Sequence, residues 1–428
     1  MREMKDSGVA WIGVIPKDWY TCKAKFLMKS PVRTGAGAEA IQYNSAEIRY
    51  IRITDFDKFG KIDDSKKVSL PKSIGEKYLL NNGDILIATA GGTVGKSMIF
   101  SDIGEPCAYA GYLAKYDINE EKLNRYFFLY FLQSPLFANY RNGMLLKSTI
   151  ENISASKYAN MDTIVPLRDE QEKIVNYLRK KCSQIDTLIS NQQQQIEKLK
   201  AYKQSVITET VTKGLDPDVQ MKDSGVEWIG EIPEHWTVAP IRSLFRIKKD
   251  IIGHEPDTVL SITQGGIKVK DINENSGQMA NSYAHYQIVN IGDFAMNHMD
   301  LLTGGVGISE FEGVTSPDYR VFVIRNAEMN PRYFFYVFQM YYRNKIFYAF
   351  GQGAANLGRW RLPAQNFNTV AVPLSPVDEQ NSIVTFLDEK CSQIDKLIAL
   401  KQQKIEKLQQ YKKSLIYEYV TGKKEITA

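Results

Sequence analysis

Residues 169–189 read DEQEKIVNYLRKKCSQIDTLI, and residues 378–398 read DEQNSIVTFLDEKCSQIDKLI. The two stretches are 209 positions apart, and 27 of the 44 positions from 169 to 212 recur in the second copy. Apolar residues return at helical spacing, and neither proline nor glycine interrupts either copy. The sequence therefore predicts the same long helix twice, which makes the fold a tandem duplication.

Weaker repeats extend the duplication to the rest of the chain. Residues 4–19 (MKDSGVAWIGVIPKDW) return as residues 221–236 (MKDSGVEWIGEIPEHW). The repeated unit has about 210 residues, which is too long for one repeat of a solenoid. Each unit combines a mixed strand-and-helix part with one long helix. The domains predicted on this basis are 1–165, 166–214, 215–372 and 373–428.

The predicted fold class is α+β: two α/β domains alternate with two long helices that pair as an antiparallel coiled coil with pseudo-two-fold symmetry. Polar Gln192 and Lys401 occupy matching core positions, where they would specify the register at some cost in stability. A helix that packs only on its own domain is the alternative. The predicted seam consists of Leu178, Ile185, Leu188, Leu199, Tyr202 and Val206 in the first helix and of Leu387, Ile394, Leu397, Leu408, Tyr411 and Leu415 in the second.

The composition is that of an ordinary globular protein, with 43% apolar and 24% charged residues and a net charge of +5 among 428 residues. Such a mild charge permits nucleic-acid binding without requiring it. Four cysteines without a C-x-x-C pair and four scattered histidines predict neither a disulfide framework nor a metal site. With no apolar leader and no membrane-spanning run, we expect a cytoplasmic protein that binds no metal.

Residues 90–97 (AGGTVGKS) resemble a phosphate-binding loop, but that loop must open a helix, and Gly104 and Pro106 soon follow. The corresponding stretch of the second unit has Ile308 in place of Lys96. We therefore predict a tight turn between strands rather than an ATP site. Similarly, Asn330 followed by proline, arginine and tyrosine is better explained as a helix start than as a methyltransferase loop. No catalytic set repeats between the units, so no catalytic residues are predicted.

Basic, amide and glycine-rich clusters are concentrated where the two units differ most. Arginine, glutamine and asparagine side chains can read base edges, and lysine and backbone N–H groups can hold phosphates. Two units with similar repeated motifs but different polar clusters indicate one scaffold that presents two binding specificities. The candidate DNA-binding residues are Arg49, Arg52, Gly91, Gly92, Lys96, Lys147, Ser148 and Asn152 in the first unit and Gln264, Lys268, Arg359, Trp360 and Arg361 in the second.

Taken together, this order of motifs resembles the specificity subunit of Type I restriction–modification systems, over essentially the whole chain. The resemblance rests on the repeated DSGV-x-WIG openings, the Gly-Asp pairs at 83–84 and 292–293, and the Ser-Pro-Asp-Tyr at 316–319. It rests also on the Val-Pro-Leu stretches at 165–167 and 372–374, which lead into Asp-Glu-Gln at each helix start, and on the Val-Thr pairs at 211–212 and 420–421.

The resemblance implies that each domain reads one half of a bipartite site on double-stranded DNA. It implies that the helices set the gap and dock modification subunits, two per chain, which carry S-adenosylmethionine and the methyl-transfer chemistry. Restriction subunits would add ATP- and Mg-dependent translocation and cleavage, while this chain itself binds no cofactor. About 40 helical residues span about 60 Å, more than the roughly 34 Å of one DNA turn, so the geometry is feasible.

Two other functions stay open at this stage. A self-contained methyltransferase or nuclease would require cofactor and catalytic motifs that the sequence does not display. A coiled-coil scaffold that binds only proteins would show no salt-dependent affinity for DNA.

Overall fold

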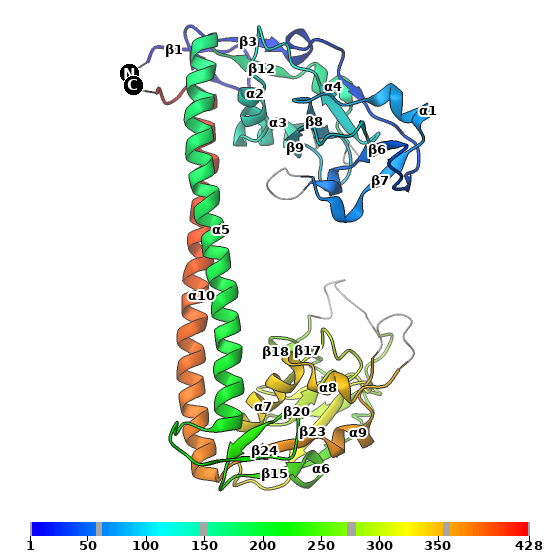
Figure 1. Ribbon diagram of the computed structural model, residues 1–428, viewed down its shortest axis with the longest axis vertical. Helices are drawn as coiled ribbons and strands as arrows, with labels where there is room; N and C mark the ends of the chain where they lie inside the picture. The colour runs from blue at the N-terminus through cyan, green and yellow to red at the C-terminus, as the bar shows by residue number, and fades with distance from the viewer. Residues whose placement is uncertain (1, 57–61, 146–151, 272–279, 354–359, 427–428) are drawn as a thin grey trace. The chain divides into compact units, whose positions relative to one another are not determined.

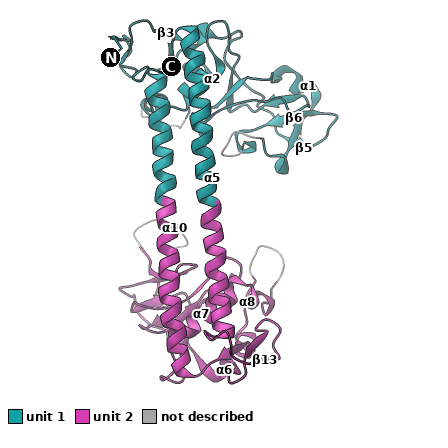
Figure 2. Ribbon diagram, turned by 60° about the vertical axis from the view of Figure 1, so that its left-hand side comes forward, with its two compact units in different colours: residues 1–193, 403–428 teal, residues 194–402 magenta. Residues whose placement is uncertain are grey.

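The computed structural model describes residues 2–56, 62–145, 152–271, 280–353 and 360–426. The chain is a mixed helix-and-strand protein with two very long helices, α5 (Arg168–Lys213) and α10 (Val377–Val420). It divides into two compact units, residues 1–193 with 403–428 (unit 1) and residues 194–402 (unit 2), coloured separately in Figure 2. Each unit holds one globular part and a portion of both long helices, so the division cuts across the domain boundaries expected from the sequence, which stay a prediction.

The globular part of unit 1 contains two four-stranded sheets, of order β10-β6-β7-β5 and β4-β11-β8-β9 (Figure 1). Its helices are α1 (Lys72–Gly75), α2 (Arg125–Leu132), α3 (Pro135–Leu145) and α4 (Ala155–Ala159). Its strands are β1 (Met4–Asp6), β2 (Val14–Pro16), β3 (Tyr20–Lys23), β4 (Arg33–Thr34), β5 (Ile41–Gln42), β6 (Ile48–Ile51), β7 (Val68–Leu70), β8 (Ile85–Ala88), β9 (Ser97–Ile99), β10 (Cys107–Tyr109), β11 (Leu113–Tyr116) and β12 (Asp162–Val165).

The globular part of unit 2 is built around one four-stranded sheet, of order β16-β23-β20-β21. Its helices are α6 (Ile241–Leu244), α7 (Pro331–Arg343), α8 (Ile346–Ala349) and α9 (Ala364–Thr369). Its strands are β13 (Met221–Asp223), β14 (Glu231–Pro233), β15 (Thr237–Pro240), β16 (Phe245–Lys248), β17 (Leu260–Thr263), β18 (Gly266–Val269), β19 (Gln287–Val289), β20 (Phe294–Met296), β21 (Val306–Ile308), β22 (Gly313–Thr315), β23 (Arg320–Ile324) and β24 (Ala371–Leu374).

In each unit, one aromatic helix packs both on the sheet and on the long helices. Helix α2 buries Phe127, Phe128 and Phe131 completely, in the same apolar cluster as Leu178 of α5 and Leu415 of α10. In unit 2, α7 occupies the corresponding place, and its aromatic side chains share a cluster with residues of both long helices. Globular part and helices therefore share one core within each unit, which stabilises the attachment of the helices through apolar burial.

The last tryptophan of the repeated opening motif attaches this segment to the long helix of its unit. Trp19 and Trp236 are fully buried, and each indole Nε1–H donates a hydrogen bond to the glutamate of the DEQ motif. The distances are 2.7 Å to Glu170 and 2.8 Å to Glu379. Each glutamate lies in the first turn of its long helix, where the positive end of the helix dipole favours a negative charge.

Within each unit, the segments of α5 and α10 lie side by side and run in opposite directions. In unit 1 the rings of Tyr177 and Tyr419 are 4.6 Å apart, and further along Lys412 pairs with Asp186 at 2.7 Å. In unit 2, Lys203 pairs with Asp395 at 2.6 Å, and Lys401 donates a hydrogen bond to Gln195 at 2.5 Å. As the residue number rises along α5, that of its contact on α10 falls, so the two helices are antiparallel.

The heptad positions predicted to line the seam are only partly buried. Leu178, Ile185, Leu387, Ile394 and Leu415 are buried, and Leu199, Val206 and Leu408 are half-buried. Leu188, Tyr202, Leu397 and Tyr411, by contrast, are 46–55% exposed, so their assignment to the seam is corrected. In α5 the second seam position lies four residues, not three, after Leu178, Ile185 and Gln192. It is occupied by Cys182 and Ile196, which are buried, and by Ile189, which is half-buried.

Candidate nucleic-acid interface

In unit 1, the glycine-rich stretch forms the turn between the antiparallel strands β8 and β9. Gly91 adopts a φ of +73°, and Gly91, Gly92 and Lys96 are all exposed. No helix follows the turn, because Ser97–Ile99 continues as strand β9. The turn thus lacks the helix N-terminus that a phosphate-binding loop of an ATPase needs.

Two other segments of unit 1 meet this turn, and a third, at Arg52, lies near one of them. Asn152 forms a β-bridge with Ala90, and Thr89 accepts a backbone hydrogen bond from Ile153 and donates one to the carbonyl of Tyr112. Burial raises the pKa of Tyr112, and the nearby positive charge of Arg52 lowers it in part. We call Arg52, Gly91, Gly92, Lys96, Tyr112, Arg141 and Asn152 the recognition edge of unit 1.

Arg141 belongs to this edge but was missed by sequence reasoning. A Cβ atom on Gly95, whose φ is +83°, would lie 2.6 Å from Cδ of Arg141, so the absence of a side chain there makes room for the arginine. The sequence offers no signal for this residue, because Arg141 lies in helix α3, more than 40 positions after the turn.

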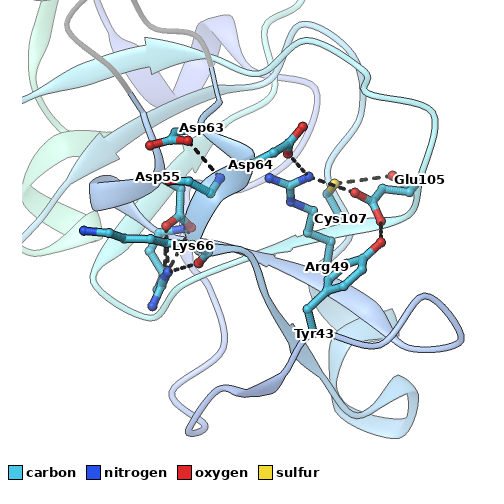
Figure 3. A network of polar contacts seen from close by, with 10 residues as sticks. Tyr43, Arg49, Asp55, Asp63, Asp64, Lys66, Glu105 and Cys107 are labelled. Carbon is cyan, nitrogen blue, oxygen red and sulfur yellow. Dashed lines mark hydrogen bonds and ion pairs between the residues drawn. The ribbon is translucent and has the colours of Figure 1, made fainter.

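Arg49 is placed differently from the other candidates. Its side chain is 3% exposed and pairs with Glu105 at 2.9 Å and with Asp64 at 2.6 Å (Figure 3). Tyr43 donates a second hydrogen bond to Glu105, at 2.8 Å. Burial by itself would raise the pKa of Glu105, but these hydrogen bonds outweigh it and lower the pKa. The guanidinium is thus committed to internal carboxylates, which argues against the predicted contact of Arg49 with DNA.

Arg52 is also ion-paired, but it is less buried. Its guanidinium holds the carboxylate of Asp55 at 2.8 Å and donates to the carbonyl oxygen of Lys66, also at 2.8 Å. One quarter of its side chain stays exposed. Contact with a phosphate or a base edge is compatible with this placement.

In unit 2, an equivalent edge is formed by the hairpin between β17 and β18 and the loop between β20 and β21. Gln264 donates from Nε2 to the carbonyl oxygen of Thr303 at 3.0 Å, and Lys268 is exposed on β18. A Cβ on Gly305 would lie 2.4 Å from the carbonyl oxygen of Thr263, so the close approach of the two segments requires glycine. Because Ile308 pairs with Phe294 as Ile99 pairs with Ile85, the residue matching Lys96 is Gly305 rather than Ile308.

The segment after helix α8 completes the edge of unit 2. Arg361 is exposed and forms a β-bridge with Gln352. Trp360 stacks on Tyr348 with ring centroids 5.3 Å apart and donates its Nε1–H to the carbonyl of the same tyrosine at 2.7 Å. The indole is half-buried and fixed by its contacts with Tyr348, so its role at the edge is to support Arg361. We call Gln264, Lys268, Thr303, Trp360 and Arg361 the recognition edge of unit 2.

Below this edge lie a buried arginine and a half-buried histidine without a carboxylate partner among the described residues. Arg320 is 5% exposed; it donates to the carbonyl of Leu362 at 2.8 Å and lies 4.7 Å from the ring centre of Phe367. Burial lowers the pKa of Arg320 to about 10. Burial, together with the charges of Arg320 and Arg361, lowers the pKa of His298 to about 4. His298 is therefore neutral at neutral pH.

Three of the candidates, Lys147, Ser148 and Arg359, lie outside the described residues. Within the described ranges, no group of three or more His, Cys, Asp or Glu side chains is arranged to hold a metal ion. A search of the same ranges finds no helix with the length and apolar character needed to cross a bilayer. The free cysteines Cys182 and Cys391 are buried in the helices, where burial raises the pKa of both thiols, to about 11 for Cys182.

Two similar frameworks with different side chains at matching edges, each fused to long helices, define a duplicated recognition protein. The family model of the Type I restriction modification DNA specificity domain matches residues 16–199. The chain is also 26% identical to the MjaX specificity subunit of a type I restriction enzyme from Methanocaldococcus jannaschii, over 96% of this chain and 95% of the relative. The chain is therefore similar, over nearly its whole length, to specificity subunits of Type I restriction–modification systems, and residues 16–199 match their DNA specificity domain.

Other comparisons agree with this assignment. The MjaVIII specificity subunit of the same organism is 22% identical, over 82% of this chain and 81% of the relative. A solved chain from a study of complex assembly and conformational transition of the type I R-M system superimposes with a TM-score of 0.69 at 12% identity, over 95% of this chain and 99% of that chain. At that identity, the match supports the fold alone. The reading as a scaffold without DNA specificity is not favoured.

Proposed function

We propose that each recognition edge reads one half of a bipartite site on double-stranded DNA. The observation that carries this proposal is the pairing of a common framework with different edge residues. The edge of unit 1 presents Lys96 and Asn152, while the edge of unit 2 presents Gln264 and Arg361. Lysine and turn amides suit phosphates, and arginine and amide side chains suit base edges.

The two long helices would form an antiparallel coiled coil with a pseudo-two-fold relation between the halves of the chain. In support, the ion pair of Asp186 with Lys412 and that of Lys203 with Asp395 join residues that correspond in the repeat, with 209 positions between Asp186 and Asp395 and between Lys203 and Lys412. A duplicated, self-complementary interface is what such a pair of helices requires.

Modification subunits would dock on the helices, two per chain. Leu188 and Tyr411 are 46% and 55% exposed, and they lie two positions from Asp186 and one position from Lys412, the residues of the ion pair of unit 1. Their counterparts in the repeat, Leu397 and Tyr202, are 47% and 49% exposed in unit 2. Large apolar side chains exposed at matching places on otherwise polar helices favour two equal docking sites for another protein. Restriction subunits would join the same complex.

The chain itself would be non-catalytic and would bind no cofactor. S-adenosylmethionine, ATP and Mg would be bound by the partner subunits. This proposal is supported by the glycine-rich turn, which leads into strand β9 and opens no helix.

The test is to co-express the chain with the modification subunit of its host and to map methylated bases in a random DNA library. A bipartite motif with a fixed gap, methylated only when this chain is present, is the expected result. Exchange of residues 20–160 for those of a relative should then change one half-site and leave the other and the gap intact. An unchanged methylation pattern with and without the chain would refute the proposal.

A further inference from the structure

The first turn of each long helix carries a glutamine that is buried against the globular part of its unit. Gln171 of α5 and Gln380 of α10 are each 1% exposed. Burying an amide is costly unless both its oxygen and its nitrogen are hydrogen-bonded. In both units both atoms have partners, and these partners belong to different elements.

In unit 1, the amide joins three parts of the chain. The backbone N–H of Asn124 donates to Oε1 of Gln171 at 2.6 Å. The Nε2 group of Gln171 donates to the carbonyl of Pro166 at 2.9 Å and to that of Lys122 at 3.3 Å. Asn124 is also the N-cap of α2, because its side chain accepts from the backbone of Tyr126. The residue that caps the aromatic helix is thus held by a residue in the first turn of the long helix.

Unit 2 repeats the arrangement with a different local sequence. Asn330, the N-cap of α7, donates its backbone N–H to Oε1 of Gln380 at 2.9 Å. Gln380 donates from Nε2 to the carbonyl of Ser375 at 2.8 Å. The side chain of Asn330 adds a hydrogen bond to Asn381 at 2.8 Å. A glutamate could replace only the acceptor half of this arrangement, and a methionine neither half.

These hydrogen bonds differ in kind from the rest of the attachment. The core shared by α2 and α5 is apolar, and apolar burial is non-directional, so it tolerates small rotations. The bond between Trp19 and Glu170 ties the opening segment, rather than α2, to the long helix. The glutamine amide is therefore a directional link between the aromatic helix and the long helix in both units, and in unit 2 Asp388 of α10 adds links to Arg332 and Tyr336 of α7.

We propose that Gln171 and Gln380 are positioning residues that fix the angle between each globular part and its long helix, and thereby the length of the gap between the two half-sites. This inference rests on the proposed function, because a gap exists only if the chain reads a bipartite site. The glutamines do not touch DNA in this proposal. They act through the aromatic helix that carries the recognition sheet.

The experiment compares the native complex with the double variant Gln171→Met, Gln380→Met in the methylation library. Methionine keeps the length of the side chain and removes every hydrogen bond. We expect both half-site sequences to persist, while methylation at gaps one base pair longer or shorter rises about three- to tenfold relative to the native gap. The matched control is Gln184→Met, Gln393→Met, which alters two exposed glutamines at corresponding places on the same helices.

Each outcome decides the proposal. If the folded double variant keeps the native gap selectivity, or loses methylation at all gaps in proportion, the glutamines serve stability only and the proposal is overturned. If the double variant fails to assemble, the single variants Gln171→Met and Gln380→Met decide, since each leaves one link intact. A native complex that methylates no bipartite motif would refute the proposed function instead, irrespective of the glutamines.

Discussion

Arg49 anchors two carboxylates in the globular part of unit 1. We expect Arg49→Met to lower the free energy of unfolding by about 2 kcal/mol, because Glu105 and Asp64 lose their buried partner. The measurement is denaturant unfolding at pH 7. Lys17→Met, which breaks an exposed pair with Glu3, is the control and should change stability by less than about 0.5 kcal/mol.

The same network predicts a dependence on pH. The pKa of Glu105 is lowered in the folded chain, so its contribution is present above the pKa of the unfolded chain and is lost as pH falls through the folded pKa. The difference in stability between native protein and Arg49→Met should therefore shrink in acid. A difference that grows in acid would contradict the assignment of Arg49 to this network.

His298 gives an independent residue-scale prediction. Its pKa of about 4 in the folded chain lies below the ordinary value of 6.5, so the unfolded chain binds more protons between these values. This contribution to stability should be present above about pH 6.5 and fall by up to about 3 kcal/mol as pH drops to 4. NMR titration of the imidazole should show a midpoint near 4, and His298→Gln should remove this part of the acid sensitivity. A midpoint near 6.5 would show that the ring is neither buried nor close to Arg320.

At the scale of elements, polar residues at matching positions lower the stability of the pair of long helices. Gln192 and Lys401 are half-buried, and Lys401 donates to Gln195 at 2.5 Å. Such residues specify register at the expense of stability. We expect Gln192→Leu with Lys401→Leu to raise the free energy of unfolding by about 1 kcal/mol, since each leucine buries apolar surface.

Thermal unfolding of the purified chain checks this prediction. The control is Gln184→Leu with Lys404→Leu, which places leucine at exposed positions of the same helices and should not raise the melting temperature. If both variants behave alike, Gln192 and Lys401 do not belong to the seam.

At the scale of the whole molecule, assembly depends on the exposed leucines and tyrosines of the helices. We expect Leu188→Ser with Tyr411→Ser to reduce the number of bound modification subunits from two to one, because only one of two equal patches is altered. Native mass spectrometry of the co-expressed complex counts the subunits. Since these side chains are already exposed, the variant should fold as well as the native chain. Retention of two subunits would place the docking surface elsewhere.

DNA affinity is a further property of the whole complex. With a net charge of only +5, the isolated chain should bind its site weakly, and specific binding should become strong once modification subunits are present. The affinity for DNA should also fall steeply with rising salt. The slope of log affinity against log salt concentration should be smaller by about one for Lys96→Gln, because one phosphate contact is lost. Titration at several fixed salt concentrations measures both effects. Equal affinity with and without the partner would contradict this expectation.

Much of the architecture is local information and could be predicted from the sequence. A duplication is visible because identical residues return at a constant offset, and a long helix is visible because nothing breaks it. The turn at Gly91 was predicted as a connection between strands because no helix could follow it. The seam was only half predictable, since positions three and four residues apart lie on adjacent faces of a helix, and the partner decides which one is buried.

The sequence predicts which types of side chain are available at the candidate interface, but not which of these side chains are exposed there. Arg49 and Arg52 lie three positions apart, yet only pairing with β7 and β10 buries the first and leaves the second partly exposed. Arg141 joins the edge solely because Gly95 leaves room for it in three dimensions.

The sequence by itself thus determined the duplication, the long helices and the residue types available at the edges, because these depend on local pattern and composition. Only the tertiary structure decided which arginine meets a carboxylate, which leucine meets solvent and which glutamine links two helices. Those outcomes depend on distances between residues far apart in the chain.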